Sequence, residues 1–454
     1  MSDRVRALQQ RVVQLEREGA DKDARIEALR RKRHVDLTSE KREALTKERA
    51  EELLGAADVD AVAVTLGTKS FGKESSAVAA EVLRQMKALE YADLADIIAG
   101  RPEAEALEVL KEMCGALPTS QVRVLDLSEN ALGEKGIRAL SDILSAMSSL
   151  QEVKFMNNGL SELSIELLRE CLPKSELRTL HFHNNMSGPG GARAASEIIA
   201  QCPVLEDFRM SSSRVRPDGG LPMIKALCAL GPRLRRVNLS DSMFDSDCTE
   251  ALVEGLSSMT NLTDLILRDT GIDKDALLDA LEDPEVLPKL SVLDLSGLEL
   301  DAEAGERVGA LVKSRLRLRK LWMDDNELES EGAENFAAAA KPCMLELLSV
   351  QTNTIGQRGA VALARFAAAT PTLTRLDLND NTISEVGLVK VKSLLEKKGR
   401  ISVLGSLDEN VDDCDEDEPL SDNEDDEDEN VADAGVEDDI DALADAMGQG
   451  MALK

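Results

Sequence analysis

The chain has 454 residues, a formal net charge of −32, and 2% aromatic against 43% hydrophobic residues. Aliphatic side chains must therefore build the core, and the acidic balance argues against binding to nucleic acid. The charged start is not a signal peptide and no apolar run reaches 18 residues, so we expect no direct membrane insertion. The seven Cys lack paired spacing and the three His form no cluster, so we predict no metal site and a reducing, soluble compartment, the cytoplasm or the nucleus.

Residues 1–58 are predicted to form a charged helical segment ahead of the main domain. Apolar residues recur in heptads from Val5 to Leu29, with a faulty third repeat. This pattern fits a short coiled coil or a solvated charged helix. Residues 30–33 (RRKR) resemble a basic import signal, although a polar helix face explains them equally simply. Residues 36–58 are interpreted as a helical lead-in that caps the first repeat.

Residues 59–407 repeat one phrase, L-x-x-L-x-L-x-x-N-x-L, with Val or Ile at some Leu positions. The clearest copies are VRVLDLSENAL (122–132), LELLSVQTNTI (345–355) and LTRLDLNDNTI (373–383). Successive copies are 27 to 29 residues apart, except for one step of 33. This is the leucine-rich repeat pattern. Its N position falls on Lys69, Ile97, Asn130, Asn158, Asn185, Ser213, Ser242, Thr270, Leu298, Asn326, Asn353 and Asn381.

Each phrase predicts a short strand with its aliphatic residues pointing inward. It is followed by a helix whose apolar residues recur at i, i+3, i+4 and i+7. One such unit cannot cover its own apolar face, whereas stacked units can. We therefore expect an α/β fold, a leucine-rich repeat solenoid of the ribonuclease-inhibitor type with about 12 repeats. Parallel strands should line the concave side and helices the convex side.

Six of the twelve N positions hold Asn. Its side chain can bond to turn backbone that would otherwise be buried without a partner. We assign this structural role to Asn130, Asn158, Asn185, Asn326, Asn353 and Asn381. Ile97 and Leu298 cannot act in this way, so those two turns must be closed differently.

A near-match to the phosphate-binding P-loop, GTKSFGKE, starts at Gly67 between a predicted strand and a predicted helix. Glu74 stands where the Mg²⁺-binding hydroxyl would be, and its charge would repel phosphate. Residues 65–72 also align position by position with residues 126–133 of a clear repeat. We interpret the segment as a repeat and predict no nucleotide cofactor on this chain.

Residues 408–454 form an acidic tail. From Asp408 to Asp445 there are 21 Asp or Glu and no Lys or Arg. Such a segment repels itself and cannot bury enough apolar surface to fold, so we expect disorder. The tail can act for solubility only, or it can attract a basic partner surface and speed the encounter.

No pairing of a nucleophile with a base is predicted. His181 and His183 occupy outward positions on the fifth strand without an orienting partner in the sequence, which favours contact with a partner over catalysis. Outward positions on the strands and at their ends supply the candidates for partner binding: Lys154, His183, Asn184, Arg209, Arg214, Asp241 and Arg268, with Trp322 and Asp325 further along. Trp322, the only Trp, can lie at an interface or pack against neighbouring strands.

Four stretches make the chain similar to plant-type Ran GTPase-activating proteins: DLADIIAGRPEAEALEVL (93–110), LDLSENALGEKGIRAL (125–140), LHFHNNMSG (180–188) and CPVLEDFRMSSSR (202–214). The resemblance spans roughly residues 60–430 and includes the acidic tail. It fails at the N-terminus. Plant relatives carry a nuclear-envelope targeting domain with a Trp-Pro-Pro motif, whereas residues 1–58 contain neither Trp nor Pro.

The resemblance implies a function in nucleocytoplasmic transport. Proteins of this family do not hydrolyse GTP themselves but bind Ran·GTP and speed its hydrolysis. The expected partner is Ran in its GTP form, alone or with a Ran-binding protein, and GTP and Mg²⁺ belong to that partner. The expected location is the cytoplasm, with the nuclear envelope as the alternative.

The resemblance also implies site residues. The family uses an Asn, in a segment similar to residues 155–160 (FMNNGL), to hold the catalytic Gln of Ran, without an arginine finger. Arg101 matches a family Arg at the Ran interface. Fungal relatives have a Lys two residues later, where this chain has Glu103.

The repeat register decides between the two Asn residues of that segment. Asn158 is an N position and should be consumed by turn hydrogen bonds, whereas Asn157 should protrude at the carboxyl ends of the strands. We assign the catalytic role to Asn157. The step of 33 adds five residues around 99–103. That loop should emerge on the same side as Asn157, about 10 Å away from it. Arg101 then contacts the partner, or the insertion only caps the repeat and Arg101 is exposed without a role. A non-catalytic adaptor or inhibitor that binds a protein on its concave face is the alternative function.

Overall fold

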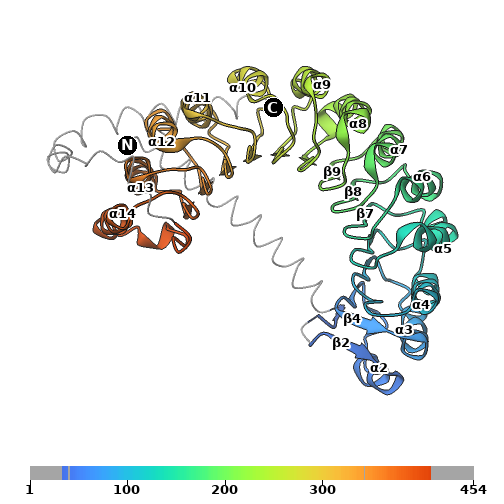
Figure 1. The fold of residues 1–454 in the computed structure, drawn as a ribbon. Coiled ribbons are helices and arrows are strands. Elements are labelled where there is room, and N and C mark those ends of the chain that lie inside the picture. Colours follow the sequence, from blue (N-terminus) through green and yellow to red (C-terminus); the bar gives the residue numbers. More distant parts are fainter. Residues whose placement is uncertain (1–32, 39–40, 342, 411–454) are drawn as a thin grey trace, which may run out of the picture. The chain divides into compact units, whose positions relative to one another are not determined.

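The structure is a computed structural model that describes residues 33–38, 41–341 and 343–410. Within these ranges, a curved parallel sheet of 13 strands lines the concave side and helices cover the convex side (Figure 1). Two further short strands form a separate parallel pair. The predicted α/β solenoid of ribonuclease-inhibitor type is confirmed.

The strands are β1 (His34–Asp36), β2 (Glu43–Leu45), β3 (Ala63–Thr65), β4 (Lys69–Phe71), β5 (Tyr91–Asp93), β6 (Val124–Asp126), β7 (Glu152–Lys154), β8 (Thr179–His181), β9 (Asp207–Arg209), β10 (Arg236–Asn238), β11 (Asp264–Ile266), β12 (Val292–Asp294), β13 (Lys320–Trp322), β14 (Leu347–Ser349) and β15 (Arg375–Asp377). The large sheet runs β1-β3-β5-β6 and then in chain order to β15, and β2 pairs with β4.

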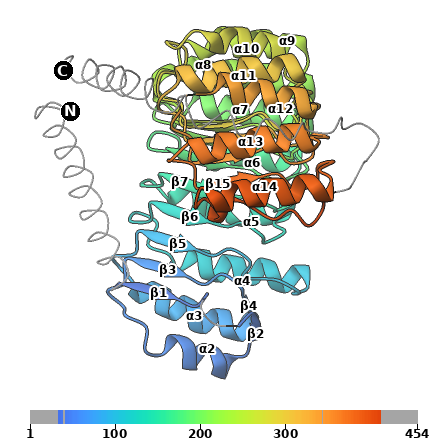
Figure 2. The same ribbon diagram turned by 90° about the vertical axis from the view of Figure 1, so that its left-hand side faces the viewer.

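The helices are α2 (Lys47–Leu54), α3 (Lys73–Gln85), α4 (Glu103–Gly115), α5 (Gly133–Ala146), α6 (Glu162–Cys171), α7 (Gly188–Ala200), α8 (Arg216–Leu230), α9 (Ser246–Leu256), α10 (Lys274–Glu282), α11 (Ala302–Ser314), α12 (Glu329–Ala339), α13 (Gln357–Ala369) and α14 (Glu385–Lys397), with 3₁₀ turns at Gly231–Arg233 and Ile401–Val403. Each helix packs beside the next, so the helices follow the solenoid in sequence order (Figure 2).

The core lies between the sheet and the helices, and the inward residues of the phrase fill it. The central residues Leu125, Val153 and Leu180 of three successive strands are buried. Phe155 and Phe182 stack with their ring centroids 6.0 Å apart. Burying one such side chain contributes about 1.5–3 kcal/mol, and the repetition of this contribution from unit to unit holds the solenoid together.

The solenoid begins one repeat earlier than predicted. Val35 on β1 pairs with Val64 on β3, and β2, which pairs with β4, and α2 complete the unit. Residues 34–38 and 41–54 therefore belong to a repeat and not to a helical lead-in before residue 59. Only the central L-x-L of the phrase is kept here, by Val35 and Leu37. An end repeat has a neighbour on one side only, and terminal repeats therefore depart from the consensus.

The Asn side chains at the N positions form a buried hydrogen-bond ladder through the turns. Asn158 Oδ1 accepts the Asn130 N–H at 2.9 Å, and Asn185 Oδ1 accepts the Asn158 N–H at 3.1 Å. The Nδ2 groups donate to turn carbonyls, as Asn185 does to Phe155 O at 2.9 Å. The same arrangement recurs at Asn326, Asn353 and Asn381.

The two turns without a polar N residue are closed by the repeat that follows them. The Ile97 N–H donates to Asn130 Oδ1 at 2.9 Å, and the Leu298 N–H donates to Asn326 Oδ1 at 3.0 Å. An Asn can therefore satisfy the backbone of the preceding turn as well as its own, which is why single apolar N positions are tolerated.

The last repeat reaches past the predicted domain end at residue 407. Leu404 forms a parallel bridge with Leu376. Asn410 Oδ1 accepts the Asn381 N–H at 3.0 Å, so Asn410 adds a further rung to the ladder. The rest of the acidic tail lies outside the described residues, as do the predicted heptads and residues 30–32 of the basic stretch.

The P-loop-like segment is an ordinary part of its repeat. Lys69 starts β4, and its buried Nζ donates to the carbonyl of Lys41. Lys73 Nζ lies 2.9 Å from Glu108 Oε2. Both Lys residues thus serve contacts within the solenoid. Among the described residues, no helix is long and apolar enough to cross a membrane.

Candidate functional site

A row of residues at the carboxyl ends of the strands shares an unusual backbone conformation. In each unit from β3 to β15, the residue before the N position has φ between 50° and 68°. We call this row the rim; it comprises Thr68, Asp96, Glu129, Asn157, Asn184, Ser212, Asp241, Asp269, Gly297, Asp325, Thr352 and Asp380.

The left-handed backbone explains the composition of the rim. Gly tolerates this conformation freely, and Asn and Asp tolerate it better than other side chains. Eight of the twelve rim residues are Gly, Asn or Asp. The left-handed turn also directs the rim side chain away from the buried hydrogen-bond ladder. A rim residue and the N-position residue that follows it therefore lie in different surroundings, one toward solvent and the other in the ladder.

Asn157 lies on the rim after β7 with an exposed side chain and φ of 50°. Its Nδ2 donates to the carboxylate of Glu129, the rim residue of the preceding repeat. Its Oδ1 accepts from Asn184 Nδ2, of the following repeat, at 3.1 Å. A carboxylate can only accept hydrogen bonds, so Glu129 holds the amino group of the Asn157 side chain toward β6. The amide oxygen of Asn157 then faces β8.

Asn158 differs from Asn157 in burial and in its hydrogen-bond partners. Its side chain is fully buried, its Oδ1 accepts the Asn130 N–H at 2.9 Å, and its Nδ2 donates to Leu127 O at 2.9 Å. The side chain that can reach a partner protein is therefore that of Asn157.

Glu129 was not among the residues singled out from the sequence. The signal that could have found it is the repeat spacing, because Glu129 stands 28 residues before Asn157 at the same position of the phrase. Residues at equal positions of successive parallel strands are neighbours about 4.8 Å apart.

Arg101 is neither idle nor extended along the rim. Its Nε donates to Ser70 Oγ at 3.0 Å and its Nη2 donates to Ser70 O at 2.9 Å, while Nη1 lies 3.9 Å from Glu105 Oε1. The side chain is 21% exposed. These contacts tie the five-residue insertion to β4. The predicted contact of Arg101 with a partner would require sharing or opening them.

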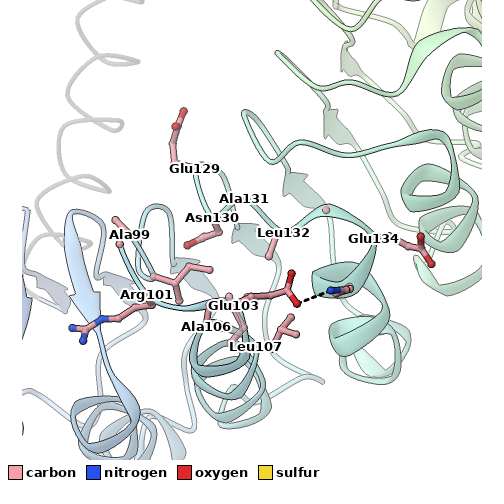
Figure 3. Close-up of a pocket in the computed structure, with 15 residues that line it drawn as sticks. Ala99, Arg101, Glu103, Ala106, Leu107, Glu129, Asn130, Ala131, Leu132 and Glu134 are labelled. Carbon is pink, nitrogen blue, oxygen red and sulfur yellow. Dashed lines mark hydrogen bonds and ion pairs between the residues drawn. The ribbon is translucent and has the colours of Figure 1, made fainter.

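The insertion also opens a crevice of about 530 Å³ between the loops before α4 and α5 (Figure 3). Leu107 and Leu132 line it, and Glu103 spans it to bond Lys135 Nζ at 2.6 Å. Arg101 also lines this crevice, but its guanidinium points away from it, toward Ser70. Glu129 lines its edge, so the crevice adjoins the rim beside Asn157.

The outward strand residues Lys154 and Arg209 are held by carboxylates of the concave face. Lys154 Nζ lies 3.6 Å from Asp126 Oδ2. Arg209 Nε and Arg236 Nε lie 3.2 and 2.7 Å from the two oxygens of Asp207. Burial by itself would raise the pKa of Asp207, but contacts with His181 and Arg209 outweigh burial and hold that pKa well below its usual range.

The two outward His residues have different surroundings. His183 is exposed, and its Nδ1 lies 2.6 Å from Ser211 Oγ. His181 is only 5% exposed and its Nε2 lies 3.1 Å from Asp207 Oδ1. His181 is outward by register, yet the neighbouring strand covers it, so it is a poor candidate for contact with a partner.

The remaining predicted contact residues follow the same side toward β11. Arg214 and Asp241 are exposed in the loops after β9 and β10. Arg268 is exposed, with Nη1 3.9 Å from Asp324 Oδ2. The candidates from Lys154 to Arg268 thus occupy five successive strands and their loops. Trp322, partly exposed on β13, lies apart from them.

No group of three or more His, Cys, Asp or Glu that could hold a metal ion occurs in the described part of the chain. Asn157 and its two bonded neighbours, Glu129 and Asn184, form a set of two amides and one carboxylate. Such a set can hold and orient a polar group of a partner.

Comparisons with known proteins agree with this architecture. A leucine-rich repeat family model matches residues 122–141 and 370–392. The solved complex of Rad7 and Elc1 from yeast superposes with a TM-score of 0.50 at 13% identity, covering 90% of this chain and 92% of that chain, and shows the fold alone. Ribonuclease inhibitor of Sus scrofa is 22% identical over 327 residues, 63% of this chain and 71% of that protein.

RAN GTPase-activating protein 2 of Arabidopsis thaliana is 37% identical over 397 residues, which cover 85% of this chain and 72% of that protein. The chain belongs to the Ran GTPase-activating protein family. The family predicted from the four sequence stretches is therefore confirmed. In a member of the Ran GTPase-activating protein family, the exposed amide of Asn157 is the candidate group for contact with Ran.

Proposed function

We propose that this protein stimulates GTP hydrolysis by Ran, and that Asn157 acts by holding the catalytic Gln of Ran so that this Gln orients the attacking water. GTP and Mg²⁺ are bound by Ran, and no cofactor is held by this chain. The alternative, a non-catalytic adaptor or inhibitor, shares the fold and differs in turnover.

The observation that carries the proposal is the contrast between Asn157 and Asn158. Asn157 is an exposed carboxamide on a rigid turn, fixed between Glu129 and Asn184. An amide can donate to the carbonyl of a Gln side chain and accept from its amino group. Its turn is held by the buried ladder below it, which favours a defined position over a mobile one.

The energetic demand on such a site is modest. Orienting a water and a Gln requires no nucleophile and no proton acceptor on this chain. Each ~1.4 kcal/mol removed from the barrier multiplies the rate about tenfold. Correct positioning of reacting groups can supply several kcal/mol.

The proposed contact surface for Ran runs from Asn157 along the loops of the following repeats. It contains Lys154, His183, Asn184, Arg209, Arg214, Asp241 and Arg268. Arg101 lies two strands before Asn157. We propose that it supports this surface through its bonds to Ser70, and its direct contact with Ran stays a prediction. The cytoplasmic location and a further Ran-binding protein also remain predictions.

The experiment is phosphate release from Ran·GTP with the full chain at one hundredth of the Ran concentration. Complete hydrolysis at a rate well above that of Ran by itself supports the proposal. Stoichiometric binding without acceleration would leave the adaptor as the function.

A further inference from the structure

Three repeats beside Asn157 expose large side chains at one shared position. Met186, Arg214 and Met243 each follow the N position of their repeat, on the loops after β8, β9 and β10. We call these three residues the methionine row. Met186 and Met243 are 61% and 63% exposed. At the same position, the flanking repeats carry Gly159 and Gly271, which present no side chain.

We propose that the methionine row is an apolar anchor for the GTPase that Asn157 acts on, so that Met186 and Met243 are covered by Ran in the complex. The inference rests on the proposed function and extends it to specific binding residues. The two Met side chains provide the apolar contact, and Arg214 between them provides a charged one.

The first argument is that two of these side chains, those of Arg214 and Met243, stand where the backbone favours Gly. Met243 has φ of 55° and Arg214 has φ of 56°, a conformation that costs a residue with a β-carbon relative to Gly. Gly159 and Gly271 adopt it at the same position with φ of 62° and 70°. The chain thus keeps a strained, solvent-exposed Met where Gly fits the backbone better.

The second argument is the density of exposed apolar side chains. Among the described residues, seven large hydrophobic side chains are exposed. Two of them, Met186 and Met243, lie in the loops after β8 and β10, and a third, Leu163, lies in the first turn of α6, in the repeat of Asn157. The Met186 N–H donates to Leu160 O at 3.1 Å, which holds Met186 against the turn that leads to Leu163. Scattered apolar residues on a surface need no explanation, whereas a cluster indicates an interaction site.

The third argument is continuity with Asn157. Met186 is one strand and Met243 three strands away from Asn157, or about 5 and 15 Å. A stable protein interface covers about 800 Å² on each partner, a patch roughly 30 Å across. The methionine row lies within this distance of Asn157. A partner that binds at Asn157 and extends toward β10 therefore covers the row. Flexible Met side chains adapt to an irregular apolar partner surface.

The test measures initial rates of hydrolysis over a range of Ran·GTP concentrations for Met186→Ala, Met243→Gly and the double variant. Each single variant is expected to raise KM about tenfold, as loss of one buried Met predicts, with kcat unchanged. Met243→Gly should also melt at or above the wild-type temperature, because it removes a side chain from a left-handed position. Weaker binding together with an equal or higher melting temperature cannot result from misfolding.

The matched control is Thr354→Gly, which changes the same position of the repeat four units later, where φ is 52°. It should relieve the same kind of strain without any change in KM. Val389→Ala removes exposed apolar surface from α14, far from the row in the sequence, and should also leave KM unchanged. An unchanged KM in both Met186→Ala and Met243→Gly would overturn the inference.

Binding of Ran loaded with a non-hydrolysable GTP analogue separates the two proposals. Wild-type protein that binds this complex without accelerating hydrolysis of Ran·GTP would overturn the proposed function. In that case, weaker binding by the Met variants would still support the anchor. Wild-type protein that neither binds nor stimulates Ran would overturn both proposals.

Discussion

At the scale of single residues, backbone conformation decides which of two adjacent amides is available. Asn157 has φ of 50° and an exposed side chain, whereas Asn158 is fully buried in the ladder. The composition of the rim shows that Asn also suits position 157 for conformational reasons. Asn at position 157 therefore has two possible reasons, its backbone conformation and its function. A substitution that keeps the conformation and removes the carboxamide separates them.

Asn157→Gly makes this separation. Gly adopts the left-handed conformation freely, so the turn should be kept while the carboxamide is lost. We expect the stimulated rate of hydrolysis by Ran to fall about 100-fold or more, with an unchanged melting temperature. Asn157→Ala should lose the same activity but melt slightly lower than Asn157→Gly, because Ala, unlike Gly, has a β-carbon, which costs about 1 kcal/mol in this conformation.

Asn184→Gly is the matched control, at the same position of the next repeat and with the same φ of 50°. It removes one hydrogen bond to Asn157 and should reduce the rate far less than Asn157→Gly does. Full activity of Asn157→Gly would end the assignment of Asn157.

Asp207 allows a second prediction at this scale, on pH and stability. Its folded pKa lies below the usual value, so its contribution to stability is complete above the unfolded pKa of about 3.9 and is lost as the pH falls through the folded pKa. Asp207→Asn should destabilise the protein by about 2 kcal/mol at neutral pH, less than for a fully buried pair, since Arg209 and Arg236 are half-exposed.

The measurement for Asp207 is the difference in melting temperature between wild-type protein and Asp207→Asn. It should stay constant from pH 7 to pH 5 and shrink below about pH 4. A difference that already disappears between pH 6 and pH 5 would mean that this carboxylate does not have a lowered pKa.

At the scale of the element, the ladder couples each turn to the next, so one rung supports two repeats. Asn158→Ala leaves the buried Asn130 N–H without its acceptor and removes one of the two side-chain donors to the Leu127 carbonyl, which keeps Asn130 Nδ2. We expect a loss of about 1–3 kcal/mol for the unsatisfied N–H. The melting temperature should fall, while the stimulated rate per folded molecule at a low temperature stays near the wild-type value. The opposite pattern, normal melting with lost activity, would exchange the roles of Asn157 and Asn158.

Repeat register made most of the fold and the placement of Asn157 predictable. The period sets which side chain is inward, and in the large sheet the central residue of each strand from β3 to β15 is buried as it predicts. Three features were not predictable from the period. The first repeat lacks most of the phrase, Arg101 folds back onto Ser70, and His181 is covered by Asp207 from the next strand. The last two depend on contacts between side chains of different repeats, which periodicity does not contain.

At the scale of the whole molecule, the acidic tail and the end of the solenoid meet at Asn410. The ladder continues to this residue, since Asn381 donates to Asn410 Oδ1 at 3.0 Å. The boundary predicted at residue 407 would cut away this rung. Residues 411–454 contain 19 Asp or Glu and one Lys. The position of a truncation therefore decides whether it tests charge or stability.

Truncation after residue 410 should leave the melting temperature unchanged, whereas truncation after residue 407 should lower it, because the Asn381 N–H loses its acceptor.

If the tail attracts a basic surface of Ran, the variant truncated after residue 410 should also associate with Ran more slowly than the full chain. The gap should be widest at low ionic strength, since salt screens exposed charges beyond about 10 Å at 0.1 M. Stopped-flow association at two salt concentrations measures this gap. Equal rates for the two proteins at both concentrations would leave the tail without a steering role, and equal melting of the two truncations would remove Asn410 from the ladder.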